Sequence, residues 1–133
     1  MPPSKNLRAV AIIPARFGSV RFPGKPLIDL NGKTLVQRVW EAAMAATTLN
    51  RVIVATDDER IAAHCENIGA EYIITSPDLP TGTDRVSAAY QALNISADAI
   101  LNIQGDEPLL QSKLIDELVM AIENSSADFA TPI

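Results

Sequence analysis

The sequence predicts an α/β protein built on one open, parallel β-sheet with helices covering both faces. Short apolar runs alternate along the 133 residues with longer segments in which apolar residues recur at helical spacing. The apolar runs are continuous, as expected of parallel strands that are buried on both faces. Loops rich in glycine, proline and hydroxyl residues follow these runs, at the edge where such a sheet binds ligands.

The predicted strands are five short segments, of which the first is the most apolar. Five consecutive apolar residues run from Ala9 to Ile13. The last segment is the weakest prediction, because Asp128 and Thr131 stand at its ends. The predicted strands are residues 9–14, 52–55, 72–75, 99–103 and 128–131.

Four helices are predicted between the strands from their apolar periodicity. Asp57 and Ser112 are the candidate N-caps of the second and fourth helices. Right-handed crossovers would turn this βαβαβαβαβ order into a three-layer, Rossmann-like sheet. The apolar positions are Leu35, Val36, Val39, Trp40 and Ala43; Ile61, Cys65 and Ile68; Val86, Ala89, Tyr90 and Leu93; and Leu114, Ile115, Leu118, Val119 and Ile122.

Length and composition predict one domain and exclude several classes of protein. We expect an N-terminal extension over residues 1–8 and a single α/β domain over residues 9–133. The net charge of −5 argues against nucleic acid as a partner, and the single cysteine excludes an internal disulfide. The short polar start lacks the apolar core of a signal peptide, and no run is long enough to span a membrane. A cytoplasmic protein is therefore expected.

The loop after the first strand is a candidate anion site. It holds three cations, Arg16, Arg21 and Lys25, and the sequence contains no acid between Ala9 and Ile28. Such cations beside glycine backbone N–H groups could hold a triphosphate and stabilise a departing pyrophosphate. A solvated basic loop without a ligand is the alternative.

Two common phosphate motifs are excluded in this loop. Five residues, not four, separate Gly18 from Gly24, and Pro26 occupies the position at which a P-loop has Ser or Thr. The dinucleotide fingerprint G-x-G-x-x-G is absent as well. The sequence therefore supports neither a P-loop ATPase nor a nicotinamide-dependent dehydrogenase.

Two other loops add candidate site residues. Asp106 follows a glycine at the end of the fourth strand and is a candidate magnesium ligand, although the segment could also be a simple turn. The loop from Thr81 to Arg85 offers hydroxyls and backbone groups that could read a base or ribose. Alternatively, Thr83 is only an N-cap and Arg85 only a solvent-facing helix residue.

Taken together, five ordered motifs resemble those of the 3-deoxy-manno-octulosonate cytidylyltransferases. The resemblance implies a nucleotide-diphospho-sugar transferase type of fold, of which this chain would be the front half. It also implies that the family's second half supplies a further metal-binding carboxylate, most of the sugar pocket and much of a homodimer contact. The motifs are residues 13–16, 19–27, 55–57, 81–85 and 102–108.

The resemblance also implies a reaction and a role for each motif. The family transfers CMP from CTP to the sugar acid 3-deoxy-D-manno-octulosonate (Kdo), releasing pyrophosphate, with Mg²⁺ as cofactor, for lipopolysaccharide synthesis. The cations of the first loop would bind the triphosphate, and Asp106 would hold Mg²⁺. Gln104 would approach the sugar. Residues 81–85 would contact the cytidine, and the residues implied in substrate binding are Ser19, Thr81, Gly82, Thr83, Arg85 and Gln104.

Alternative functions remain open at this point. An acylneuraminate cytidylyltransferase or a sugar-1-phosphate uridylyltransferase would share the fold, although the first loop follows the octulosonate pattern. A nucleotide-binding domain without turnover is the alternative from another class of protein.

Overall fold

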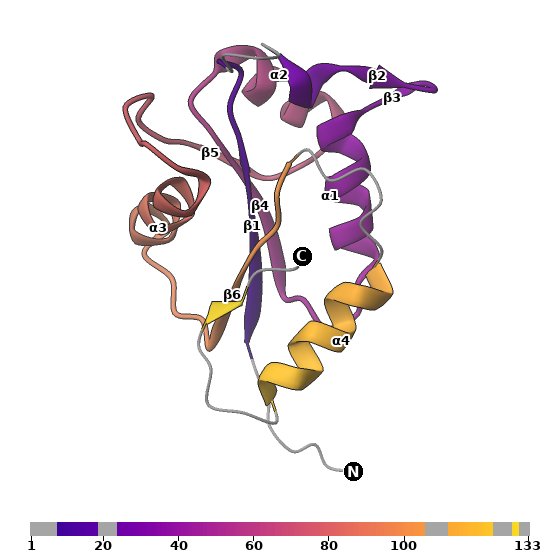
Figure 1. Ribbon diagram of the computed structural model, residues 1–133, viewed down its shortest axis with the longest axis vertical. Coiled ribbons are helices and arrows are strands. Elements are labelled where there is room, and N and C mark those ends of the chain that lie inside the picture. Colours follow the sequence, from indigo (N-terminus) through magenta and orange to yellow (C-terminus); the bar gives the residue numbers. More distant parts are fainter. Residues whose placement is uncertain (1–7, 19–23, 106–111, 124–128, 131–133) are drawn as a thin grey trace.

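The computed structural model describes residues 8–18, 24–105, 112–123 and 129–130. Within them, the predicted alternation of strands and helices is confirmed (Figure 1). The strands of the main sheet are β1 (Ala9–Ala15), β4 (Arg51–Thr56), β5 (Tyr72–Ile74), β6 (Ala99–Asn102) and β7 (Phe129–Ala130). The helices are α1 (Leu35–Ala45), α2 (Glu59–Ile68), α3 (Gly82–Leu93) and α4 (Ser112–Glu123).

The main sheet is parallel, and β1 lies at its centre. Its strand order is β5-β4-β1-β6-β7, and every neighbouring pair is parallel. On one side β1 pairs with β4, where Ala15 lies opposite Thr56, and on the other with β6, where Ile12 lies opposite Asn102. All seven residues of β1 are buried, which explains its continuous apolar run.

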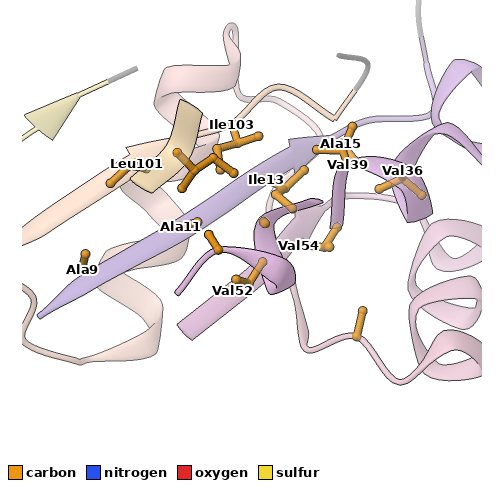
Figure 2. Packing of buried hydrophobic residues seen from close by; sticks show 14 of the residues in the cluster. Ala9, Ala11, Ile13, Ala15, Val36, Val39, Val52, Val54, Leu101 and Ile103 are labelled. Atoms are coloured by element: carbon orange, nitrogen blue, oxygen red, sulfur yellow. The ribbon is translucent and has the colours of Figure 1, made fainter. Parts of the chain in front are cut away.

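Helices cover both faces of the sheet, so the predicted three layers are confirmed. Alternate residues of β1 enter two separate cores, because successive side chains of a strand point to opposite faces. Val10 and Ile12 pack against Val86 and Ala89 of α3. The other face carries α1, α2 and α4. Figure 2 shows part of this larger core, formed by Ala9, Ala11, Ile13, Ala15, Val36, Val39, Val52, Val54, Leu101 and Ile103.

The prediction of right-handed crossovers throughout is wrong for one connection. The helices α1 and α4 cover the same face, yet the steps from β1 to β4 and from β6 to β7 run toward opposite edges of the sheet. Two such crossovers have opposite hands, so the usual rule cannot hold for both. The position of α4 is fixed by its buried apolar residues and by Asp116, whose carboxylate accepts hydrogen bonds from the backbone N–H groups of Thr47 (3.2 Å) and Thr48 (2.9 Å).

A small β-hairpin was not predicted. After a short 3-10 helix, η1 (Lys25–Leu27), the strands β2 (Asp29–Leu30) and β3 (Lys33–Thr34) pair antiparallel and lead directly into α1. Asn31 and Gly32 form the turn between them with φ angles of 57° and 94°. An Asn-Gly pair is the strongest short signal for a two-residue hairpin. Its strands are only two residues long, too short to show an alternating pattern.

The caps of two helices differ from those predicted. Asp58, not Asp57, caps α2, because its carboxylate accepts hydrogen bonds from the backbone N–H groups of Arg60 (2.8 Å) and Ile61 (3.4 Å). Thr81, not Thr83, caps α3. Each of the described helices has at most 12 residues, too few to cross a bilayer. Most of the predicted N-terminal extension lies outside the described residues.

Candidate functional site

The loops singled out in the sequence meet at one edge of the sheet. They follow β1, β4, β5 and β6, and the carboxyl ends of parallel strands all lie at the same edge. Contacts between the loops confirm this arrangement. A Cβ atom at Gly82, in the first turn of α3, would lie 3.4 Å from Pro14 Cγ and 3.6 Å from Gln104 Oε1. The end of β1, the start of α3 and the residues after β6 therefore adjoin one another.

A backbone hydrogen bond closes the first loop. The N–H of Gly24 donates to the carbonyl of Phe17 at 2.7 Å, so the two ends of the loop lie side by side. Arg16 precedes one of these residues and Lys25 follows the other, so the hydrogen bond brings the backbone of two of the three predicted cations to neighbouring positions. The Nε of Arg16 donates to the carbonyl of Gly18 at 2.5 Å. Arg16 is exposed and Lys25 is half-buried at the start of η1. Ser19 and Arg21 lie outside the described residues.

The ring of Phe17 braces the closed loop. Gly24 has a φ of 75°, and a Cβ atom there would lie 2.9 Å from Phe17 Cε2. On α2, the guanidinium of Arg60 lies 3.3 Å from the centroid of the same ring and pairs with Asp58 at 2.7 Å. The hydrogen bond from Arg60 holds the pKa of Asp58 below its usual value. Sequence reasoning did not single out Arg60, since nothing in its local sequence indicates a stacking partner.

Asn102 links the end of β6 to α3. Its side chain is 1% exposed, and its amide donates to Thr83 Oγ1 at 3.3 Å. Its carbonyl oxygen accepts from Gln104 Nε2 at 3.2 Å. Two predicted substrate-binding residues, Thr83 and Gln104, are thus exposed side chains oriented by one buried amide. A polar residue at the end of an apolar strand was the available signal for Asn102.

Gly105 lets the loop after β6 approach the first strand. A Cβ atom at this position would lie 2.9 Å from the carbonyl oxygen of Pro14 and 3.3 Å from Ala15 Cβ. Real Cβ atoms do not approach backbone oxygens so closely, so the position requires glycine. Gly105 therefore lies against the strand that leads into the basic loop. The candidate metal ligand, Asp106, follows it in sequence and lies outside the described residues.

We expect the Gly105→Ala substitution to destabilise the fold by about 1–3 kcal/mol, the usual cost of overpacking a buried site. Gly18→Ala is the matched control, because a Cβ atom at Gly18 would meet nothing within 4 Å. Its free energy of unfolding should stay within about 0.5 kcal/mol of the unchanged protein. Urea denaturation measures both variants. Equal stability of the two would contradict the close packing of this loop on β1.

The hydroxyl of Thr81, a predicted substrate-binding residue, caps the N-terminus of α3. Thr81 Oγ1 accepts from the backbone N–H of Asp84 at 3.0 Å and donates to the Asp84 carboxylate at 2.8 Å. The alternative interpretation of Thr83 as the N-cap is therefore wrong. The interpretation of Arg85 as a solvent-facing residue is wrong as well, because its side chain is only 2% exposed.

Comparison with known proteins identifies the family. A family model described as "Cytidylyltransferase" matches residues 10–133. The chain belongs to the cytidylyltransferase family. Among curated cytidylyltransferases, it is 47% identical to the 3-deoxy-manno-octulosonate cytidylyltransferase of Zea mays, over 99% of this chain and 45% of that protein. It is 44% identical to the 8-amino-3,8-dideoxy-manno-octulosonate cytidylyltransferase of Shewanella sp. (strain W3-18-1), over 92% of this chain and 51% of that protein.

A solved structure confirms the fold of this cytidylyltransferase chain. The structure of a CMP:2-keto-3-deoxy-manno-octonic acid synthetase complexed with CTP matches with a TM-score of 0.85 and 38% identity. The match covers 90% of this chain and 49% of the other. The cytidylyltransferase chain thus spans about half the length of the relatives it matches.

The described part of this cytidylyltransferase chain contains no cluster of three or more His, Cys, Asp or Glu residues that could hold a metal ion. The closed basic loop and the contact between Gly105 and Pro14 lie at the same edge of the sheet, and Asp106 follows Gly105 in sequence.

Proposed function

We propose that this chain is the nucleotide-binding half of an enzyme that transfers CMP from CTP to Kdo and releases pyrophosphate. The observation that carries the proposal is the closed basic loop at the carboxyl edge of the sheet. There, Arg16 and Lys25 flank the hydrogen bond between Phe17 and Gly24. The similarity to a synthetase complexed with CTP supports CTP as the nucleotide. The same similarity favours an octulosonate cytidylyltransferase over an acylneuraminate cytidylyltransferase, a sugar-1-phosphate uridylyltransferase or a nucleotide-binding domain without turnover.

The cations of the first loop would act on the triphosphate. In the proposed reaction, the anomeric hydroxyl of the sugar attacks the α-phosphorus, and the bond to the β-phosphate oxygen breaks as pyrophosphate leaves. Negative charge grows on that leaving group. Arg16 and Lys25, with Arg21, would neutralise it from fixed positions, and such preorganised charge dominates catalysis of phosphoryl-type transfers.

The remaining candidates would position the two substrates. The first turn of α3, with the Thr83 hydroxyl and the backbone of Gly82, would contact the cytidine, as would Ser19. Gln104 would reach the sugar from the end of β6, oriented by its hydrogen bond to Asn102. Because Thr81 Oγ1 is committed to Asp84, we assign Thr81 a contact only through its backbone.

Asp106 would hold Mg²⁺ together with oxygens of the triphosphate. When bound, the ion would neutralise phosphate charge and hold the α-phosphate in a defined orientation. The contribution of this chain is the rigid support of the preceding residue, Gly105, against β1.

The sugar is the least constrained part of the proposal. Relatives named for Kdo and for its 8-amino analogue resemble the chain almost equally, at 47% and 44% identity. Assays should therefore offer both sugars. A homodimer, a role in lipopolysaccharide synthesis and a cytoplasmic location stay predictions that follow from the family resemblance and from the sequence.

Lys25→Ala tests the triphosphate role of the first loop. We expect it to weaken binding of CTP·Mg²⁺ by about 1.5–3 kcal/mol, the scale of a charge-assisted hydrogen bond, and Arg21→Ala should act similarly. Titration calorimetry measures the change. Lys33→Ala is the matched control, because Lys33 lies in the β2–β3 hairpin and pairs with Glu41 at 2.8 Å. Unchanged affinity in both loop variants would remove the assignment.

A further inference from the structure

The largest fully buried side chain among the described residues belongs to a charged residue, Arg85. It lies in the first turn of α3 and is 2% exposed. Burial of a cation is unfavourable unless its charge and its N–H groups find partners. Burial accordingly lowers the pKa of the Arg85 guanidinium, although arginine stays charged in proteins. A residue that is retained at this cost calls for an explanation beyond filling the core.

Among the described residues, the side chain of Arg85 contacts polar groups in the loops after β4 and β5. Its Nη1 donates to Thr75 Oγ1 at 2.5 Å and to the carbonyl of Ser76 at 3.1 Å. Its Nη2 lies 3.9 Å from Asp57 Oδ2, and the other oxygen, Asp57 Oδ1, is buried and has no hydrogen-bond partner among the described residues. Asp57 is thus the counter-ion of Arg85, which explains why it does not cap α2. The guanidinium also feels the positive charge of Arg16, which lowers its pKa further.

These contacts bracket the loop that leads into α3. Thr75 and Ser76 begin the loop, and Thr81 ends it as the N-cap of the helix that carries Arg85. The backbone N–H of Thr75 is itself fixed by the carbonyl of Thr56, at the end of β4. Apart from Leu79, which is half-buried, the residues between these anchors are exposed. The conformation of this loop therefore depends on its two ends, and the hydrogen bonds of Arg85 connect one end to the other.

We propose that Arg85 is a positioning residue that fixes the loop over residues 76–81 for recognition of the nucleoside, acting through Thr75 and Ser76. This inference rests on the proposed function, and it replaces direct contact between Arg85 and the nucleotide. The planar fork of the guanidinium directs Nη1 toward both Thr75 and Ser76 while Nη2 faces Asp57, whereas the ammonium of lysine is a point charge without that geometry. The triphosphate, in contrast, is held by the first loop. Loss of the guanidinium geometry should therefore weaken binding of the nucleoside part of CTP and leave binding of the triphosphate part unchanged.

The test compares two ligands on the same variant. Titration calorimetry on Arg85→Lys would use CTP·Mg²⁺ and inorganic tripolyphosphate with Mg²⁺. We expect the Kd for CTP to rise about tenfold, the effect of losing a hydrogen bond from a charged donor, while that for tripolyphosphate stays within about twofold. Thr75→Val removes the hydroxyl acceptor with little change of shape, and it should give the same pattern with a smaller loss. Thr75→Val also serves if Arg85→Lys does not fold.

Arg51→Lys is the matched control. Arg51 pairs with Glu71 at the start of β4, the opposite end of that strand from Asp57, and its substitution should change neither affinity. An equal loss for CTP and tripolyphosphate would overturn the inference, since Arg85 would then serve the triphosphate site. Unchanged affinity for both ligands in a folded Arg85→Lys protein would also overturn it and leave only a structural role. Failure of the unchanged protein to bind CTP would instead remove the proposed function, and this inference with it.

Discussion

Asp106→Asn, in a protein that contains both halves of the family fold, is expected to lower kcat for CMP-Kdo formation by about 10²- to 10³-fold. The amide keeps the shape of the carboxylate and loses its charge, so the magnesium ion would be held by the triphosphate with less help from this chain. Loss of one preorganised electrostatic partner in a transition state typically has an effect of this size. Pyrophosphate release measures the rate at saturating substrates.

The fold of the Asp106→Asn variant should be intact, and circular dichroism checks this. Asp98→Asn is the matched control, because Asp98 lies just before β6, at the opposite end of the strand, where it accepts a hydrogen bond from the backbone N–H of Arg8 at 2.8 Å. Its activity should be unchanged. A folded Asp106→Asn protein with near-normal turnover would end the assignment of Asp106 as metal ligand. Restoration of activity by a higher Mg²⁺ concentration would support it.

The sheet could be predicted because its pattern is local. A strand at the centre of a parallel sheet is buried on both faces, so the run from Ala9 to Ile13 is apolar at every position. The hairpin of Asp29–Leu30 and Lys33–Thr34 escaped prediction because two-residue strands carry no periodic signal, although Asn31 and Gly32 marked its turn. The hand of the last crossover depends on which face α4 packs against. That choice is made by contacts such as Asp116 with Thr48, 68 residues apart in sequence.

The sequence predicted the loops of the candidate site and their charged and polar residues, but not the residues that support them. Arg16 and Lys25 stand out as cations in a loop without acids, and their place after β1 follows from the strand order. The residues that hold the site together do not stand out, because their partners are remote in sequence. Asn102 reaches Thr83, and Arg60 stacks on Phe17. Such support is set by packing of whole elements, which a single sequence does not display.

The 133 residues by themselves are expected to form CMP-Kdo at least about 10³-fold more slowly than a protein that also contains the second half of the family fold. The chain spans about half the length of the curated relatives reported above. Transfer to phosphorus depends on holding the sugar hydroxyl and the α-phosphorus in line, which contributes up to ~7–11 kcal/mol. In this chain, Gln104 is the only proposed contact with the sugar, and one side chain cannot fix a sugar acid in that geometry.

Nucleotide binding should survive in the isolated chain, which separates the two steps experimentally. A ligand at 100 times its Kd adds ~2.7 kcal/mol to the free energy of unfolding, so CTP·Mg²⁺ should raise the Tm measurably. The same preparation is then assayed for CMP-Kdo formation beside the longer protein, with Kdo and its 8-amino analogue as acceptors. A raised Tm with very slow turnover is the expected result, since in the proposed function the first loop and α3 would bind the nucleotide whether or not the sugar is held. Equal rates in the two proteins would show that these 133 residues already position the sugar, and that the second half is dispensable for catalysis.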